Sequence, residues 1–266
     1  MALDLQKHYT QQLQQNIVAV QQNLHLGPEH AQLLTKMQKF AAKNGFTLDQ
    51  VRDEIERSPL FAACFAKDPV KQNLHEQAVA RYIAGMSPLV RYFQNLPSGG
   101  DPAVYLHSND VLVGVKPTAD GSSVKSIDFT WVTGGFRVYA LQKWTKEEGG
   151  GQDHQHAEAV RFITAAMGVH RTTPRPAVPE LGLPGDVELG LVGQDGLVPT
   201  MFVALCDGDY YAHARSGHPT RINEMATAVE KASHVWACGI NDLAEVLCPV
   251  HKSFGTVAPC TPSEKP

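Results

Sequence analysis

The sequence predicts an α/β protein with a helical N-terminal extension, and three observations lead to this fold class. Apolar residues recur with a helical period through residues 1–96. β-Branched and aromatic residues then fill short segments, separated by turn residues, over 103–144. An amphipathic segment at 154–168 precedes another apolar segment at 199–206. The order from residue 70 onward is therefore helix, three strands, helix and strand, which is typical of a mixed sheet covered by helices.

Four helices are expected within residues 1–96. Two apolar stripes indicate the first two helices: Leu13, Ile17, Val20 and Leu24, then Leu33, Leu34, Met37, Phe40 and Ala41. Thr47 and Gln50 form a capping box that opens the third helix. The fourth helix follows Asp68-Pro69, and its inward side is expected to carry Leu74, Ala78, Val79, Tyr82 and Ile83.

The pattern of apolar residues changes at Pro97-Ser98-Gly99-Gly100, after which strands are predicted. Residues 103–114 and 124–132 are expected to be the first two strands, and 136–144 the third, which returns after the turn Thr133-Gly134-Gly135. Residues 170–198 are rich in Pro and Gly without a clear period, which predicts a long loop or flap. One helix is expected over 220–236, and Asp242 caps a short one.

Three regions follow from this organisation. They are a helical region over 1–96, an α/β core with C-terminal helices over 97–252, and a flexible tail over 253–266. The chain has 266 residues, 43% of them hydrophobic, which is enough for a sizeable core.

Composition also limits the class of protein. No run of eighteen apolar residues predicts a membrane span, and the first residues lack the pattern of a secretion signal. Five cysteines form an odd, scattered set, which favours reduced thiols in a cytoplasm. The net charge of −4 argues against a general nucleic-acid coat protein, but a DNA enzyme needs only a local basic surface.

A carboxylate and an amine are expected to meet on the predicted hairpin 124–144. Because side chains alternate along a strand, Asp128 shares a face with Ser126 and Thr130. On the returning strand, Lys143 shares a face with Arg137, Tyr139 and Leu141. If the two faces coincide, an acid that can hold Mg²⁺ lies beside a cation that can orient water and stabilise a pentavalent phosphate.

These residues resemble the PD-(D/E)XK nuclease core over about residues 70–207. Asp128 matches the first acid of the motif and Lys143 matches its lysine, whereas the second acid is replaced by Leu141. The segments KSIDF (125–129) and GGGQDHQ (149–155) are similar to stretches of some type II restriction endonucleases. The resemblance implies a magnesium-dependent enzyme, without an organic cofactor, that cuts double-stranded DNA at a short specific site in the bacterial cytoplasm. It also implies a homodimer, because paired cuts in palindromic DNA favour two-fold symmetry.

Roles for individual residues follow from the same resemblance. Asp128 would bind Mg²⁺ together with a second acid and the backbone carbonyl of Leu141, and Lys143 would orient the attacking water. Such families tolerate migration of the second acid, and the candidates are Glu76, Asp153 and Glu158. Glu76 is the first choice because it lies on the helix before the sheet, although a lone glutamate on an amphipathic helix is usually a surface residue.

Several polar residues are expected to line the site or to contact DNA. Gln142, Asp153, Gln152 and Gln155 are placed at the site or its DNA-facing rim, and Arg171, Arg175 and Tyr210 are predicted DNA contacts. Asp153 is equally well explained as the N-cap of the helix that follows the glycines. The arginines are weaker candidates, because arginines on exposed loops are usually only solvated.

Two other functions are consistent with the sequence. Cys238, Cys248, His251 and Cys260 have the chemistry of zinc ligands, but their spacing lacks a paired C-x-x-C, and Cys238 is expected on an apolar helix. A non-catalytic DNA-binding or interaction protein on the same fold is the second alternative, and the absence of an acid at Leu141 is its best support. No G-x-S-x-G elbow, P-loop or dinucleotide fingerprint is present.

Overall fold

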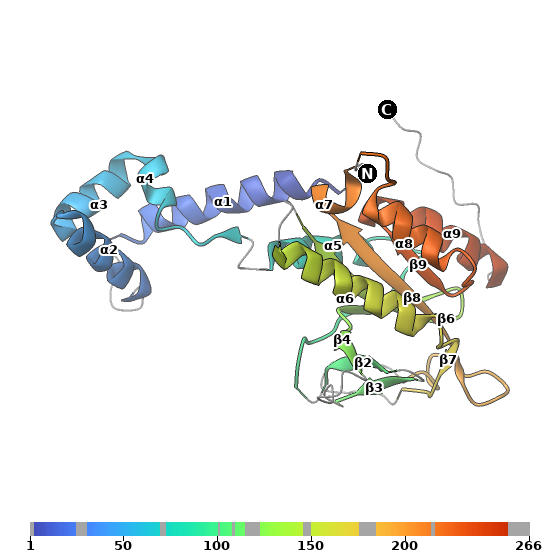
Figure 1. Ribbon diagram of the computed structural model, residues 1–266. Helices are drawn as coiled ribbons and strands as arrows, with labels where there is room; N and C mark the ends of the chain where they lie inside the picture. Colours follow the sequence, from blue (N-terminus) through green and yellow to red (C-terminus); the bar gives the residue numbers. More distant parts are fainter. Residues whose placement is uncertain are drawn as a thin grey trace. The chain divides into compact units, whose positions relative to one another are not determined.

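The computed structural model describes most of the chain in two compact units (Figure 1). The described residues are 3–24, 31–69, 73–100, 102–107, 110–114, 123–145, 150–175, 185–213 and 216–254. One unit comprises residues 4–78, and the other comprises residues 1–3 and 79–266. Nearly all of the predicted tail, from residue 255 onward, lies outside the described residues. Within the described part, no helix is both long and apolar enough to cross a membrane.

The unit formed by residues 4–78 is helical, as the sequence predicts. The expected capping box is present, because Thr47 Oγ1 accepts from the Gln50 amide at 3.2 Å and Gln50 Oε1 accepts from the Thr47 amide at 2.8 Å. The helix before it ends at Asn44 and is followed by Gly45, whose φ of +74° favours glycine. Phe40 packs against Phe61 and Phe65 in the core of this unit. Its helices are α1 (Leu5–Gln22), α2 (Ala31–Asn44), α3 (Leu48–Arg57) and α4 (Pro59–Ala63), and α5 (Leu74–Ala84) continues into the second unit.

The second unit is built on a mixed six-stranded sheet. Its order is β1-β5-β6-β8-β7, and β9 also pairs with β8. β1, β5 and β6 are antiparallel neighbours, whereas β8 is parallel to β6 and β9 is parallel to β8. α6 (Gly150–Ala166) connects the parallel pair β6 and β8. The strands are β1 (Arg91–Asn95), β5 (Phe129–Thr133), β6 (Phe136–Trp144), β7 (Arg171–Thr172), β8 (Val198–Asp207) and β9 (Val235–Cys238).

A separate three-stranded sheet interrupts this order and corrects two predicted strands. The expected strand 103–114 is a hairpin of β2 (Val104–His107) and β3 (Val111–Val113). The expected strand 124–132 breaks at residues 127–128, so that β4 (Ser123–Ser126) pairs with β2 while β5 belongs to the large sheet. The interruption has a simple cause, because residues 127 and 128 donate their amides to different sheets, at Val104 and Ala140.

Two strands lie in segments for which the sequence predicts helix. β1 falls within 1–96, and Phe93 there packs against Phe129 and Trp131 of β5. The predicted helix 220–236 is divided into α8 (Arg221–Val229) and β9, which completes its hydrogen bonds against β8. In both cases a neighbouring strand supplies the hydrogen-bond partners of the backbone. Local propensity cannot reveal this pairing.

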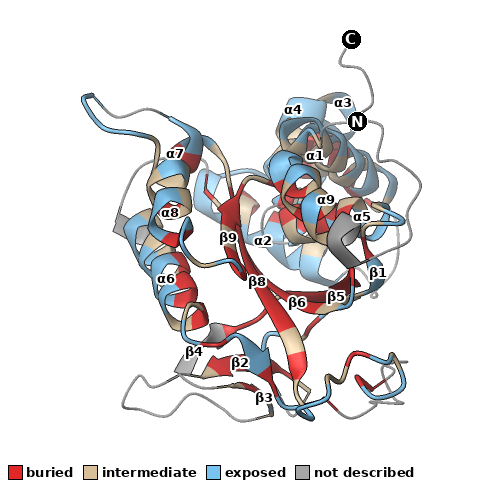
Figure 2. Ribbon diagram, turned by 90° about the vertical axis from the view of Figure 1, so that its right-hand side faces the viewer, coloured by how far each residue is buried: buried red, intermediate tan, exposed pale blue. Residues whose placement is uncertain are grey.

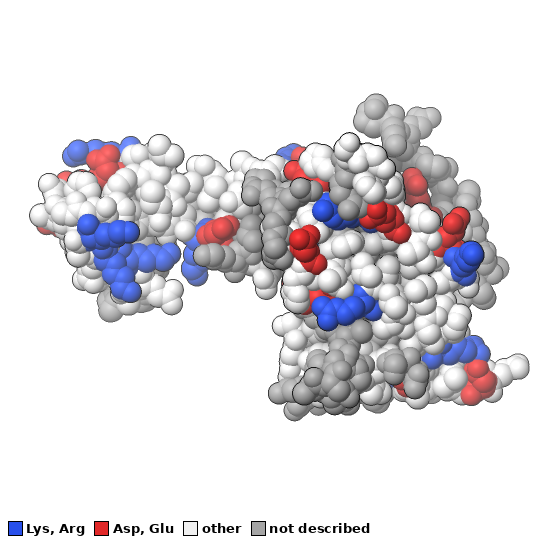
Figure 3. Space-filling view, in the orientation of Figure 1, with Lys and Arg blue, Asp and Glu red and all other residues white. Residues whose placement is uncertain are grey.

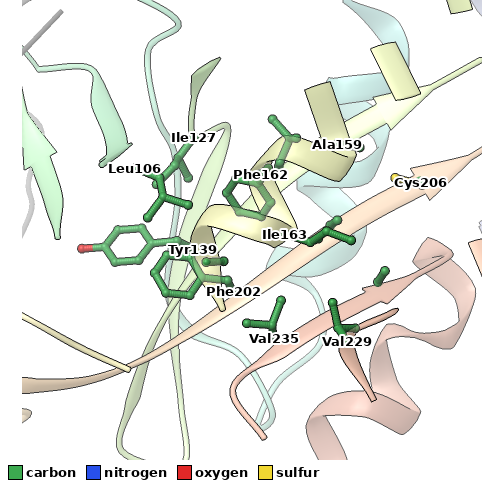
Figure 4. Packing of buried hydrophobic residues seen from close by; sticks show 14 of the residues in the cluster. Leu106, Ile127, Tyr139, Ala159, Phe162, Ile163, Phe202, Cys206, Val229 and Val235 are labelled. Atoms are coloured by element: carbon green, nitrogen blue, oxygen red, sulfur yellow. The ribbon is translucent and has the colours of Figure 1, made fainter. Parts of the chain in front are cut away.

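The main core lies between the large sheet and α6 (Figures 2 and 4). Tyr139 of β6 and Phe202 of β8 stack at a centroid distance of 6.0 Å, and Phe162 of α6 meets Phe202 edge-on at 6.1 Å. Ile127, between β4 and β5, and Val235 of β9 belong to the same cluster. α6 and α8 cover this face of the sheet, and α9 (Leu243–Phe254) lies on the other. A short helix α7 (Asp209–Ala212) and a 3₁₀ turn η4 (Ile240–Asp242) follow strands β8 and β9.

A buried ion pair attaches part of the predicted long loop to the sheet. Arg137 of β6 donates from Nε at 2.9 Å and from Nη2 at 2.5 Å to Asp186 Oδ1, and both side chains are almost fully buried. Asp186 Oδ2 accepts from the Arg175 amide at 2.8 Å. Leu191 packs nearby on Val132. Apart from β7, the described parts of the segment, residues 170–175 and 185–197, form a loop as predicted, and it is attached to the sheet through Asp186 and Leu191. Residues 176–184 lie outside the described residues.

Candidate active site

Asp128 is held where β5 and β6 diverge. Its backbone amide donates to the Ala140 carbonyl at 3.0 Å, and its carbonyl accepts from the Leu96 amide at 2.8 Å. Its carboxylate oxygen Oδ2 accepts from the Gln142 amide at 2.7 Å, in the place where a further β5 residue would have paired. The carboxylate is therefore fixed to β6 one residue before Lys143, and it is partly exposed.

The register of β5 and β6 places Thr130 opposite Tyr139, on the face of β6 that also carries Lys143. The alternation does not extend to Asp128, because the chain leaves the strand at residues 127–128 and Ile127 packs in the cluster that contains Tyr139. That Asp128 and Lys143 share a face therefore stays a prediction. The expectation for Ser126 is wrong, because this residue ends β4 in the other sheet and pairs with Tyr105.

Lys143 is buried and forms an ion pair with Glu158 of α6. Its Nζ donates to Glu158 Oε2 at 2.6 Å, and only 6% of the lysine side chain is exposed. The second oxygen, Glu158 Oε1, lies 3.4 Å from Nε2 of His154 one turn earlier on the helix. A buried ammonium needs such a partner, because desolvation without a counter-charge is costly. Glu158, one of the candidates for the second acid, therefore contacts the predicted catalytic lysine.

Leu141 cannot supply the expected metal-binding carbonyl on the side of Asp128. Its side chain is fully buried in the core, and its peptide with Gln142 is trans, since the one cis bond of the described chain is Ser87–Pro88. In a trans peptide the carbonyl points away from the amide hydrogen, which is directed at Asp128. The Leu141 carbonyl thus faces β8, and the Gln142 carbonyl faces Asp128, because both backbone groups of a strand residue point to the same side.

The predicted glutamines near the site occupy different environments. Gln155 Oε1 accepts from Thr145 Oγ1 at 2.8 Å, which ties α6 to the end of β6. Gln142 alternates with Lys143 and so faces the other side of the sheet, where its Nε2 is buried without a hydrogen-bond partner in the described chain. Gln152 is partly exposed in the first turn of α6.

Asp153 and Tyr210 support α6. The Tyr210 hydroxyl donates to Asp153 Oδ1 at 2.7 Å, the ring is 2% exposed, and the Arg221 guanidinium lies 3.7 Å from the ring centroid. The helix begins at Gly150, so Asp153 is inside its first turn and the N-cap interpretation is wrong. Tyr210 is held inside the protein rather than presented on its surface, which does not favour the predicted DNA contact.

The two predicted DNA-binding arginines differ in exposure. Arg171 is exposed and forms an ion pair with Asp195. Arg175 is 5% exposed, and burial lowers the pKa of its guanidinium. The expectation that Arg175 lies on an exposed loop is therefore wrong.

The remaining predicted ligands lie on other elements or outside the described residues. Glu76 lies in the first turn of α5, in the helical unit, and its role as a metal ligand stays a prediction. Cys238 is buried in β9 rather than on a helix. The side chain of His251 and all of Cys260 lie outside the described residues. Among the side chains that are described, no three His, Cys, Asp or Glu residues cluster as metal ligands.

Cys206, beside Lys143 in register, is no thiolate nucleophile, because burial raises the pKa of its thiol to about 12.

Asp207 ends β8, and the sequence favours a polar turn for it over a place in the site. It lies in register with Trp144, and its Oδ1 accepts from the Ile240 amide at 3.0 Å. Its Oδ2 is buried without a hydrogen-bond partner in the described chain. Burial raises the pKa of Asp207 to about 6, the charge of Asp242 adds to this effect, and the Ile240 amide opposes it. Its position at the carboxyl end of a parallel strand was the available signal.

We expect Asp207→Asn to stabilise the protein at neutral pH and not in acid. The folded pKa lies above the value of an unfolded aspartate, so the folded state favours the neutral form, and this contribution is lost as the pH rises through about 6. The variant should therefore gain on the order of 1–2 kcal/mol in free energy of unfolding at pH 7.5. Below about pH 4, the wild type and the variant should be equally stable, since an unfolded aspartate also becomes neutral there.

Urea unfolding of both proteins between pH 4 and 8 measures this difference. Asp209→Asn, at an exposed position two residues later, is the matched control and should show no gain that grows with pH. A pH-independent difference for Asp207→Asn would contradict the assignment.

Comparison with known proteins gives no relative for this chain. No protein-family model, curated protein or solved structure matches it. The function is therefore proposed from the geometry around Asp128, Lys143 and Glu158.

Proposed function

We propose that the chain is a magnesium-dependent endonuclease that hydrolyses phosphodiester bonds of double-stranded DNA at a specific site. The order of elements supports this proposal. α5, β1, β5, β6, α6 and β8 follow one another, and the sheet runs β1-β5-β6-β8 with β8 parallel to β6. The succession of helix, three strands, helix and strand along the chain is the one implied by the nuclease resemblance, once the sheet of β2, β3 and β4 is treated as an insertion between β1 and β5 and the two-residue β7 is set aside.

The single observation that carries the proposal is the contact between Lys143 and Glu158, one residue along β6 from the Gln142 amide that binds the Asp128 carboxylate. The nuclease motif needs a second acid, and residue 141 is a leucine. Glu158 reaches Lys143 from α6 at 2.6 Å and so offers a carboxylate at the end of β6 that carries the lysine. We assign Glu158, in preference to Glu76, as the second acid.

The donor set fits magnesium. This ion takes oxygen ligands, needs only one or two carboxylates from the protein, and keeps water and substrate oxygens as its other ligands. Asp128 and Glu158 would hold it, with the Gln142 carbonyl as a third oxygen on the Asp128 side. When bound, Mg²⁺ polarises a phosphoryl oxygen and lowers the pKa of coordinated water.

In this proposal, Lys143 stabilises the negative charge that develops on the scissile phosphate and orients the attacking water. Its ammonium is largely withdrawn from solvent, and a cation in such an environment interacts more strongly with developing negative charge than it would in water. Glu158 fixes the position of the amine in the absence of DNA. Specific cutting of both strands also favours a homodimer, with Gln152 and Gln155 on the DNA-facing rim.

Digestion of supercoiled plasmid and phage DNA tests the proposed activity. We expect discrete fragments with Mg²⁺, no cleavage with EDTA, and binding without cleavage in Ca²⁺. Sequencing the fragment ends then gives the recognition site and the cut position. A mobility shift with intact DNA in Mg²⁺ would instead identify the chain as a non-catalytic DNA-binding protein.

Glu158→Gln tests the assignment of the second acid. The substitution keeps the shape of the side chain but removes a charged ligand, so we expect a loss of about 10²-fold or more in cleavage rate and a higher Mg²⁺ requirement. Glu76→Gln tests the rival acid in the same assay, and Glu230→Gln, at an exposed position, is the control. Wild-type cleavage by Glu158→Gln together with inactive Glu76→Gln would return the role to Glu76.

A further inference from the structure

Helix α2 of the helical unit presents three lysines on one side. Lys36, Lys39 and Lys43 are spaced three and four residues apart, which places them along a single stripe of a helix. All three are exposed, and α2 contains no acidic residue. In Figure 3, blue side chains gather over this helix.

The positive charge of this stripe is not neutralised within the described chain. None of the three lysines forms an ion pair there; Lys36 Nζ donates to the backbone carbonyl of Phe65 at 3.3 Å. The core side of α2 is defined by Met37 and Ala41, so the lysines extend from the solvent side. The stripe is thus a local basic surface in a chain whose net charge is −4.

The next helix of the same unit carries both signs of charge. α3 packs against α2 and carries Asp49, Asp53, Glu54 and Glu56 together with Arg52 and Arg57, and Arg52 forms an ion pair with Asp49. The charged residues of α2, by contrast, are all lysines. Mixed signs cancel, whereas a stripe of one sign attracts a polyanion.

We propose that the α2 stripe binds the phosphate backbone of double-stranded DNA. The choice of DNA as the polyanion rests on the proposed function. Lys36 and Lys43 are seven residues apart, which corresponds to roughly 10 Å along the helix axis and suits a surface that follows the duplex backbone. Lysine contacts to phosphate position a protein on DNA and add affinity without reading sequence.

The salt dependence of DNA binding tests the stripe directly. Binding of a labelled duplex is measured by fluorescence anisotropy in Ca²⁺ without Mg²⁺, for the full-length wild type and for the variant Lys36→Gln/Lys39→Gln/Lys43→Gln. Each phosphate contact contributes about 0.9 to the slope of log K against log salt. We expect the slope of the variant to fall by about 2–3, and its affinity at low salt to fall more than tenfold. Between 50 and 200 mM salt, the wild type should lose roughly 40-fold more affinity than the variant.

A matched variant separates a local surface from the total charge. Lys7→Gln/Lys67→Gln/Lys231→Gln removes the same three charges from exposed positions outside α2, and it should change the slope by less than one. Equal slopes for the wild type and the α2 variant, or equal losses in the two triple variants, would overturn the inference. Thermal unfolding of each variant confirms that the fold is retained.

The experiments distinguish a failure of the inference about α2 from a failure of the proposed nuclease function. If the wild type cuts DNA in Mg²⁺ but the α2 variant binds DNA like the wild type, the DNA-binding role of the α2 stripe is refuted and the proposed nuclease function is retained. If the wild type binds DNA through α2 without cutting it, the nuclease is refuted and the stripe is retained. A wild type without affinity for duplex DNA overturns the stripe as a DNA-binding surface.

Discussion

Lys143→Met is expected to reduce Mg²⁺-dependent DNA cleavage by about 10²–10³-fold or more. The substitution removes the ammonium that stabilises charge on the phosphate, and the loss of a single such group from a preorganised site is typically of this size. Methionine is close to lysine in length and can pack in the buried part of the site. Single-turnover cleavage with saturating enzyme measures the chemical step without the contribution of DNA affinity.

The same substitution also affects stability, so it needs a control. Removing one partner of a buried ion pair leaves the other charge uncompensated, and Glu158 has only 17% of its side chain exposed. In the double variant Lys143→Met/Glu158→Gln neither charge remains, and stability should return towards the wild-type value. Cleavage should stay absent in the double variant. Recovery of cleavage along with stability would mean that the lysine is only structural.

Calcium-supported DNA binding provides a second readout. The lysine acts on the transition state in the proposed mechanism, so the variant should retain most of its affinity for duplex DNA in Ca²⁺. Wild-type cleavage rates in Lys143→Met would end the assignment of Asp128, Lys143 and Glu158 as an active site.

Asp186→Ala is expected to destabilise the second unit by about 3–5 kcal/mol. It leaves the Arg137 guanidinium, which is 1% exposed, without its carboxylate, and it also removes the acceptor of the Arg175 amide. At this magnitude the loss is a large fraction of the stability of an ordinary domain. Denaturant unfolding followed by circular dichroism measures it.

An exposed ion pair of the same chain is the matched control. Arg171 and Asp195 are each about two-fifths exposed, so Asp195→Ala should cost no more than about 1 kcal/mol. The double variant Arg137→Met/Asp186→Leu should be more stable than Asp186→Ala, because no unpaired charge is left inside. Equal effects of Asp186→Ala and Asp195→Ala would show that burial of the first pair has no energetic consequence.

Local signals predicted the helices and the hairpin of β5 and β6 well. The capping box at Thr47 and the turn at Gly134-Gly135 involve neighbours in sequence, so their chemistry is visible in a short window. β1 and β9 were assigned to helices, because each is defined by pairing with a distant strand rather than by its own few residues. The break at residues 127–128 was missed for the same reason, since two sheets share one continuous β-rich segment.

Sequence and structure contribute different parts of the proposed site. Sequence placed Asp128 and Lys143 on adjacent strands and named Glu158 among three candidates for the second acid. It ranked Glu76 first, since nothing local distinguishes two glutamates on amphipathic helices. The Leu141 carbonyl, chosen from the sequence as a metal ligand, faces β8 instead of Asp128, because the direction of a carbonyl depends on which neighbouring strand its peptide faces.

By itself, the sequence determined the α/β class, the helical extension and the residue types available for phosphate chemistry, because periodicity and turn chemistry are local properties. Only the tertiary structure decided which acid meets Lys143, that Arg175 and Tyr210 are buried, and that β6 is parallel to β8. Those outcomes depend on contacts between residues far apart in the chain. Such contacts are settled by the joint packing of α6 and the sheet, which no single segment encodes.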